Sequence, residues 1–173
     1  MYSHTLALLL IAALLLTTTP TGVEGQVLVS ENLGRNAYTA SGFWREITPP
    51  EGAFDGETRK RPPYWNSGAH PPQWIEVDLQ GSYPITRVKL IVEQLPRTPC
   101  RTTHQVWVSP RSMGEDLSGA TLLFTFSGST RDGDWLDHEL TSPVSGRHVQ
   151  IRTTRSPSWV AWREVQVFAA VPF

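Results

Sequence analysis

The sequence predicts an all-β fold, an antiparallel β-sandwich of the jelly-roll type with about eight strands. Short segments in which apolar and polar residues alternate recur along the chain, as they do in strands with one buried face. Clusters of Gly, Pro, Ser and Asp separate these segments. No long segment repeats apolar residues at helical spacing, so at most a short helical turn is expected, near residues 50–54 or 116–120.

The expected strands follow one another in a regular order along the chain. In the clearest one, residues 73–79, apolar Ile75 and Val77 point one way and Glu76 points the other. Proline-rich stretches fall between strands and are expected to form stiff loops, which is where binding sites usually lie on a rigid scaffold. The remaining expected strands are 27–29, 38–44, 85–92, 105–108, 122–126, 135–140, 148–154 and 164–168.

Residues 1–25 are predicted to be a signal peptide. The apolar run from Leu6 to Leu16 is shorter than the roughly 20 residues that a membrane-spanning helix needs. Small residues after the run fit a signal-peptidase site before Gln26. The sequence therefore predicts a secreted protein with one domain over residues 26–173, a length that suits a single core. In the alternative interpretations, the apolar run is an uncleaved N-terminal anchor or a core helix.

Composition excludes several classes of protein. A net charge of −1 is unlike that of a protein held on nucleic acid by its own charge, so no nucleic-acid partner is expected. The single Cys100 excludes an internal disulfide framework and a cysteine-based metal cluster. This cysteine is either a buried apolar group or a free thiol on a loop, and pairing between two chains stays open.

Four motifs together resemble a known family. They are Ala-Phe-Asp-Gly at 53–56, Tyr-Trp-Asn-Ser at 64–67, the strand at 73–79, and the closing segment at 158–165. In this order they resemble the coagulation factor V/VIII type C domain, or discoidin domain, of the galactose-binding-like fold, over residues 31–168. The single cysteine makes the chain most similar to the bacterial members, the family 32 carbohydrate-binding modules, because animal discoidin domains commonly join their ends through a pair of cysteines.

The resemblance implies an eight-stranded jelly roll whose loops at one end bind the ligand. In many members of the family this ligand is a sugar, and in others it is a phospholipid head group or a protein. The partner expected for this chain is therefore a glycan or glycoconjugate. A protein or a membrane surface is the alternative, and Phe43 with Trp44 could form only one hydrophobic spike for a membrane.

A structural calcium ion is also expected. Asp55, followed by a glycine and further oxygen-bearing residues, suits a hard cation that takes six to eight oxygen ligands. The resemblance implies that Glu164 in the last strand closes this site, with backbone carbonyls around Ala53, Thr58 and Trp162. In the alternative interpretation, Asp55 only caps a turn and Glu164 pairs with an arginine.

Sugar recognition needs an aromatic ring against the apolar face of a pyranose and polar groups for its hydroxyls. The resemblance implies sugar contacts from a polar residue just after the loop tryptophan and from another at the end of strand 85–92, which are Asn66 and Gln94 here. Trp159 is the best candidate for the exposed ring. The full set of candidate loop residues is Trp44, Arg45, Asn66, His70, Gln94, Arg97, Arg101 and Trp159.

The sequence therefore predicts a non-catalytic binding module rather than an enzyme. A glycoside-acting enzyme would need two carboxylates facing each other across a cleft. Asp132 and Asp134, on either side of Gly133, are the only closely spaced pair that could suggest this, and a hairpin turn explains them more simply.

Overall fold

The computed structural model describes residues 25–59 and 61–171. The expected signal peptide lies outside these residues except for Gly25. Within the described part of the chain, no helix is long and apolar enough to cross a membrane.

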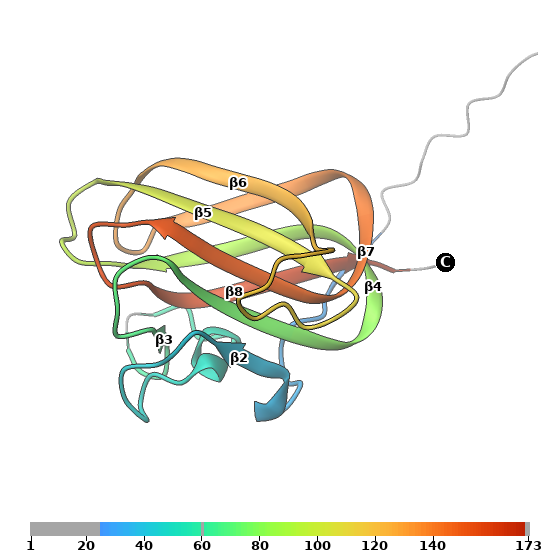
Figure 1. Ribbon diagram of the computed structural model, residues 1–173, viewed down its shortest axis with the longest axis horizontal. Coiled ribbons are helices and arrows are strands. Elements are labelled where there is room, and N and C mark those ends of the chain that lie inside the picture. The colour runs from blue at the N-terminus through green and yellow to red at the C-terminus, as the bar shows by residue number, and fades with distance from the viewer. Residues whose placement is uncertain (1–24, 60, 172–173) are drawn as a thin grey trace, which may run out of the picture.

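The predicted all-β jelly-roll class is confirmed (Figure 1). The only helical elements among the described residues are two short 3-10 turns, η1 (Arg35–Ala37) and η2 (Pro50–Ala53). The turn expected near residues 50–54 is therefore present as η2. The strands are β1 (Gln26–Leu28), β2 (Tyr38–Ala40), β3 (Trp65–Asn66), β4 (Gln73–Glu93), β5 (Cys100–Ser109), β6 (Thr121–Thr130), β7 (Trp135–Arg155) and β8 (Ala161–Ala170).

Two long strands, β4 and β7, each replace two strands that the sequence analysis treated as separate. The first part of β4 pairs with β2 and with the second part of β7, whereas its second part pairs with β8 and with the first part of β7. The pairing register shifts between Asp78 and Tyr83, where β4 bends. The strand order is β1-β8-β4-β7-β5-β6, with β2 beside β4 and β3 beside β8.

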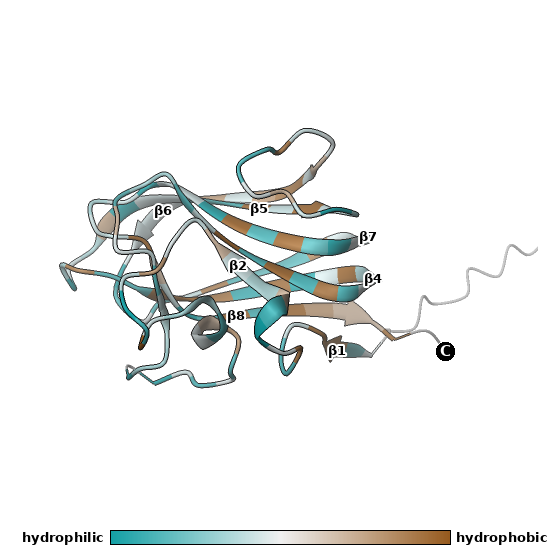
Figure 2. Cartoon of the chain, turned by 60° about the horizontal axis from the view of Figure 1, so that its bottom comes forward, coloured by the Kyte–Doolittle hydropathy of each residue, from teal (hydrophilic) through white to brown (hydrophobic). Residues whose placement is uncertain are grey.

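One hydrophobic core lies between the two walls that these bends create. Ile75 and Val77 from the first part of β4 belong to the same buried cluster as Val88 and Leu90 from its second part. Figure 2 shows apolar and polar residues alternating along the central strands, as expected for strands with one buried face. The alternation read from the sequence thus identifies the core-facing side chains correctly.

One local expectation was wrong. The strand expected over residues 38–44 ends at Ala40, and the Ser41 hydroxyl then hydrogen-bonds Gln73. Of the two alternative places for a short helical turn, residues 116–120 are not helical. The Asp116 carboxylate accepts hydrogen bonds from the backbone N–H and the hydroxyl of Ser118, and this side-chain turn competes with helical hydrogen bonding.

Both ends of the described chain lie at one end of the sandwich. The Val171 N–H donates to the Gly25 carbonyl over 2.9 Å, and β1 pairs with the last residues of β8. The loops that follow β3, β4 and β7 extend from the opposite end, at the left in Figure 1. This end, called the loop end below, lies opposite Gly25 and Val171.

The bend of β7 leads to a stability prediction. A Cβ on Gly146 would lie 2.0 Å from Cγ2 of Val108, a buried and stiff core side chain. Gly146→Ala should lower the free energy of unfolding by about 1–3 kcal/mol through overpacking, as measured by urea denaturation. The double variant with Val108→Ala should recover part of this loss, because it removes the clashing methyl group. If the double variant lost as much stability as the two single variants combined, this result would contradict the clash.

Candidate functional site

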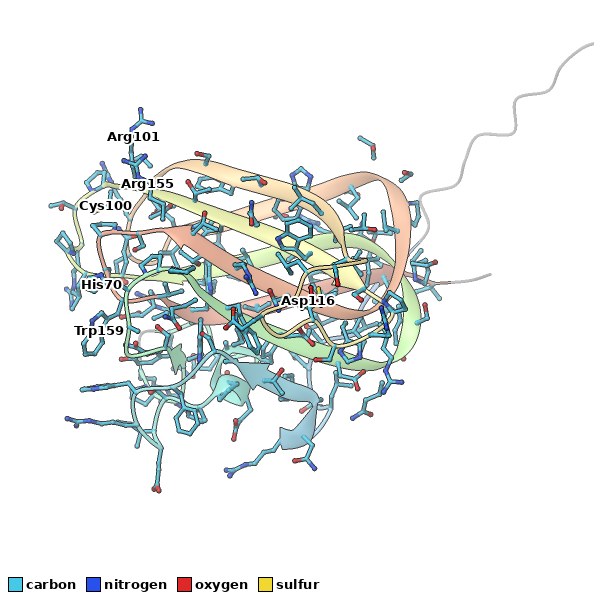
Figure 3. All side chains as sticks on the ribbon, in the orientation of Figure 1. His70, Cys100, Arg101, Asp116, Arg155 and Trp159 are labelled. Atoms are coloured by element: carbon cyan, nitrogen blue, oxygen red, sulfur yellow. The ribbon has the colours of Figure 1, made fainter. Side chains whose placement is uncertain are left out.

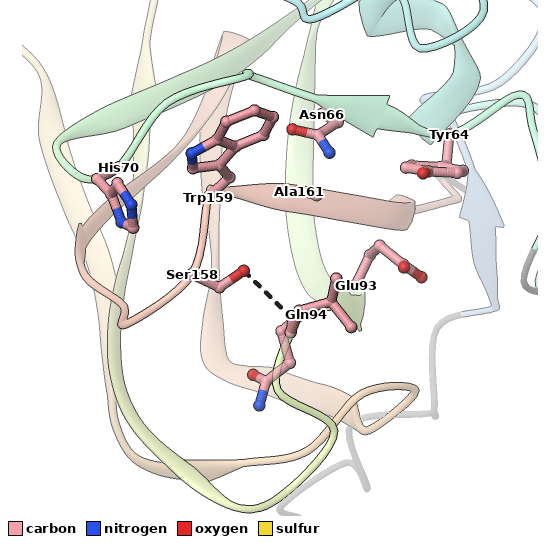
Figure 4. A pocket seen from close by; sticks show the side chains of 9 residues that line it. Tyr64, Asn66, His70, Glu93, Gln94, Ser158, Trp159 and Ala161 are labelled. Atoms are coloured by element: carbon pink, nitrogen blue, oxygen red, sulfur yellow. Dashed lines mark hydrogen bonds between the residues drawn. The ribbon is translucent and has the colours of Figure 1, made fainter.

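Three loops are joined by hydrogen bonds at the loop end. They connect β3 to β4 (residues 67–72), β4 to β5 (94–99) and β7 to β8 (156–160). The Ser67 N–H donates to the Val160 carbonyl over 2.9 Å, and the Val160 N–H donates to the Ala69 carbonyl over 3.0 Å. The Leu95 N–H donates to the Ser158 hydroxyl over 3.2 Å (Figure 4). The 156–160 loop therefore fixes the other two.

A pocket of about 350 Å³ opens between these loops. Its size lies within the range of small-molecule sites in proteins. Four of the residues expected from sequence line it, and so do five that the sequence analysis missed. The lining residues are Tyr64, Asn66, His70, Glu93, Gln94, Leu95, Ser158, Trp159 and Ala161.

Trp159 supplies an aromatic wall of this pocket and is 40% exposed. Its ring lies edge-on to that of Trp44, with 5.9 Å between the ring centroids, and the Arg45 guanidinium carbon lies 3.9 Å from the centre of the Trp44 ring. Gly68, at φ 73°, lets Trp44 come close, because a Cβ there would lie 3.2 Å from the Trp44 Cα. Trp44 and Arg45 thus support Trp159 from outside the pocket.

Asn66 and His70 bring polar groups to the same pocket. The Asn66 Oδ1 accepts the backbone N–H of Gly68 over 2.9 Å, which fixes the orientation of the amide. Among the described residues, neither the Asn66 Nδ2 nor the His70 ring has a hydrogen-bond partner in the protein. These groups can therefore serve a ligand beside the exposed ring of Trp159 (Figure 4).

Gln94 lines the pocket, but its amide is used inside the protein. The Nε2 donates to the Thr130 carbonyl over 2.9 Å, and the Thr130 hydroxyl donates to Oε1 over 2.7 Å. The side chain is 5% exposed, and Figure 4 shows its amide pointing away from Trp159 and Asn66. Gln94 thus anchors the 94–99 loop to Thr130. Its amide does not point toward the place where the sequence analysis expected a sugar contact.

Two of the expected arginines lie outside the pocket. Arg97 is on the 94–99 loop, with its Nε 3.8 Å from the Asp132 carboxylate. Arg101 lies in β5 and lines a second hollow with Arg155, near the upper left of Figure 3, whereas His70 and Trp159 are labelled below it. The sequence analysis grouped Arg97 and Arg101 with the pocket residues. The positions of loops along the chain do not show which hollow an arginine side chain reaches.

Among the pocket residues that the sequence analysis missed, Glu93 carries a buried, charged side chain. Its carboxylate is buried and accepts the Arg163 Nε–H over 2.8 Å, while the same guanidinium donates to Asp132 over 2.8 Å. Tyr64, also missed, directly precedes the Trp65-Asn66 motif, and this position is a signal that could have identified it. The turn carboxylate of Asp134 accepts the backbone N–H of Arg131, as expected for turn chemistry.

The expected calcium site contains one buried carboxylate, that of Glu164. Glu164 is fully buried, its Oε2 accepts the Gly56 N–H over 3.2 Å, and within residues 25–59 and 61–171 its Oε1 has no hydrogen-bond partner. Burial, together with the negative charges of Glu31 and Asp55, raises the pKa of Glu164 to about 9. An unpartnered buried oxygen in such surroundings suits a cation, which would stabilise the ionised carboxylate.

The other members of the expected shell lie on elements near Glu164. Ala53 ends η2, which packs on β8, Thr58 follows on the exposed segment after it, and Trp162 pairs with Trp65 between β8 and β3. No group of three or more His, Cys, Asp or Glu side chains suited to a metal occurs in residues 25–59 and 61–171. A calcium shell here would therefore depend on backbone carbonyls, as the sequence analysis expected. Glu31, which it missed, adds negative charge.

The described residues define a jelly-roll domain with an open aromatic pocket at the end opposite its termini. The chain belongs to the F5/8 type C domain family, whose model matches residues 36–165. No curated protein sequence matches the chain.

Solved structures of similar fold include several bacterial modules. Chitosan-binding module 1 of a chitosanase/glucanase from Paenibacillus sp. IK-5 is 26% identical, with a TM-score of 0.62 over 82% of this chain and 98% of that module. A family 32 module from Clostridium perfringens, solved with GalNAc-β-1,3-galactose, is 17% identical, with a TM-score of 0.63 over 83% of this chain and all of that one. The family 32 module of C. perfringens NanJ, solved with galactose, is 14% identical, with a TM-score of 0.61 over 83% of this chain and 98% of that one.

The hydrogen bonds of Gln94 lead to a prediction. Gln94→Ala removes two buried hydrogen bonds with Thr130, so it should lower the free energy of unfolding by about 1–3 kcal/mol in urea denaturation. Gln166→Ala is a matched control, because Gln166 is half-buried on β8 and its side chain makes no hydrogen bond among the described residues. Wild-type stability of Gln94→Ala would contradict the anchoring role.

Proposed function

We propose that the protein is a secreted, non-catalytic module that binds carbohydrate in the loop-end pocket. The observation that carries the proposal is the exposed Trp159 ring beside the unpartnered polar groups of Asn66 and His70, around a space of about 350 Å³. A pyranose presents an apolar face for stacking on a ring and hydroxyls for hydrogen bonds. The secreted location rests on the apolar run and cleavage pattern in residues 1–25.

The similar structures support a glycan as the ligand. The module that shares 26% of its residues with this chain is named as chitosan-binding, and others of the same fold were solved with galactose or with a disaccharide containing it. These ligands differ in their sugars, so the similarity supports the class of ligand and leaves the particular sugar to experiment.

The carboxylates near the pocket support a non-catalytic role. Glycosidases use two carboxyl groups about 5–9 Å apart, of which one acts as acid and the other as base or nucleophile. Here Glu93 and Asp132 share one guanidinium, that of Arg163, at 2.8 Å from each. Two carboxylates joined through one arginine are suited to holding the 131–134 turn against β4 and β8 rather than to facing a sugar from opposite sides.

One observation favours a second candidate, a membrane or protein surface. Phe43 and Ile47 are 53% and 55% exposed, and they lie on the same loop as Trp44, which is 42% exposed. Exposed apolar side chains grouped on one loop are typical of contacts with another surface. A folded sample that binds no glycan at high protein concentration would favour this candidate.

A glycan array tests the proposed function. The full chain should bind a selective set of glycans, and Trp159→Ala should weaken this binding by at least about tenfold, because the stacking face is lost. Trp135→Ala is a matched control, since Trp135 is 45% exposed but does not line the pocket. Equal binding by Trp159→Ala and wild type, or equal weakening by both variants, would contradict the assignment of the pocket.

We also propose that Glu164 and Asp55 hold a structural calcium ion. The ion would add a positive charge beside the buried Glu164 carboxylate, so it would join η2 and the segment after it to β8. It would take no part in chemistry at the pocket.

Calcium binding gives a separate test in the absence of any sugar. Saturating calcium should raise the Tm of the wild-type chain by about 5 °C, and a chelator should reverse the shift. Glu164→Gln keeps the shape of the side chain but removes its charge, so calcium should no longer change the Tm. Asp116→Asn is the control, because Asp116 is an exposed carboxylate on the 110–120 loop that accepts hydrogen bonds from Ser118. An unchanged wild-type Tm in calcium would overturn the proposal.

A further inference from the structure

A second hollow at the loop end has a basic lining. It has a volume of about 360 Å³ and is lined by Cys100, Arg101, Arg155, Ser156 and Pro157, with no acidic residue among them. Figure 3 shows Arg101 and Arg155 close to Cys100, at the same end of the molecule as His70 and Trp159. The sequence analysis had singled out Arg101, and the pocket described above does not include it.

The strand register directs both arginines to the same face. Arg155 pairs with Thr103 between β7 and β5, and Arg101 precedes Thr103 by two residues, so both side chains project from the outer face of the sheet. The register shift between Thr103 and His104 makes this possible, because Thr153, two residues before Arg155, is buried. The shift thus turns Arg155 outward next to Arg101.

These two arginines differ from most others in the molecule. Arg35, Arg87 and Arg147, for example, each form an ion pair with a carboxylate at 3.0 Å or less. Among the described residues, Arg101 and Arg155 have no ion pair and no side-chain hydrogen bond. Their guanidinium groups are exposed and can each offer a fork of donors to a carboxylate or a sulfate.

A single loop separates the basic hollow from the aromatic pocket. Ser156 and Pro157 line the hollow, whereas the next two residues, Ser158 and Trp159, line the pocket. Three residues of extended chain span at most about 10 Å, so one oligosaccharide can reach both sites. The chain as a whole has a net charge of −1, so its attraction for anions is confined to local features such as this one.

We propose that Arg101 and Arg155 form an anion subsite that selects acidic glycans, which bear a carboxylate or a sulfate ester one or a few sugars away from the unit stacked on Trp159. This inference rests on the proposed carbohydrate-binding function and specifies the class of its ligand. The subsite adds charge-assisted hydrogen bonds to the stacking in the aromatic pocket. Neutral glycans use the aromatic pocket alone.

The test compares each acidic glycan with its neutral counterpart. The full chain is measured against immobilised polygalacturonate and its methyl ester, and against dextran sulfate and dextran, together with a glycan array of sulfated and uronic-acid-containing members beside their neutral parents. At least one acidic member should bind about tenfold more tightly than its parent. The two polymer pairs show whether carboxylate or sulfate is preferred. Equal affinity for every acidic and neutral pair would overturn the anion subsite.

Substitutions then locate the effect. Arg101→Gln and Arg155→Gln should each weaken binding of the preferred acidic glycan by about tenfold and leave binding of its neutral parent unchanged. Both side chains are exposed and unpaired, so the Tm should stay at the wild-type value. Arg111→Gln removes the same charge beyond the other end of β5, about 30 Å away along the strand, and should have no effect. Equal weakening by Arg111→Gln would show attraction by net charge alone and would overturn the subsite.

The remaining outcomes separate this inference from the proposed function. Neutral binding that depends on Trp159, without preference for acidic members, would keep the proposed function and overturn the subsite. Acidic binding that depends on Arg101 and Arg155 but not on Trp159 would overturn the aromatic pocket and leave the anion site in place. Equal binding to single-stranded DNA through the same arginines would show a general polyanion site and would overturn selection of glycans. No binding to any glycan would overturn both.

Discussion

The bends of β4 and β7 are the constraint on which the rest of the structure depends. Each strand is 21 residues long and contributes to both walls of the sandwich, so the two walls enclose one core. The bend of β7 leaves no space for a side chain at Gly146, because Val108 occupies it. Since the bends fix how the walls lie against each other, they also determine which loops meet at the far end.

Hydrogen bonds between the loops hold the pocket in shape. Backbone hydrogen bonds join the 67–72 loop to Val160, the Ser158 hydroxyl holds the 94–99 loop, and Gln94 anchors that loop to Thr130. A ligand that enters a site fixed in this way has less chain to order, so more of the contact energy is expressed as affinity.

The distribution of charge divides the loop end into parts with different chemistry. Carboxylates next to the aromatic pocket are paired with Arg163, whereas the buried carboxylate of Glu164 has an oxygen without a hydrogen-bond partner among the described residues. Arg101 and Arg155, in contrast, face solvent without a counter-charge within the described protein. The exposed ring of Trp159, the buried carboxylate of Glu164 and the exposed guanidinium groups of Arg101 and Arg155 therefore lie at separate places on one scaffold, so each can be substituted without the others.

Sequence patterns were enough to predict the fold class, the core-facing residues of the long strands and the loop positions of His70 and Trp159, because alternation and turn residues are local signals. Asn66, which was expected on a loop, lies in the two-residue strand β3. Only the tertiary structure decided that Gln94 turns inward to Thr130, that Glu93 joins the pocket and that Arg101 meets Arg155 rather than Trp159. Local patterns show whether a side chain faces the core or the solvent. They do not show which distant segment lies opposite, since strand register and hydrogen bonds between loops set those neighbours.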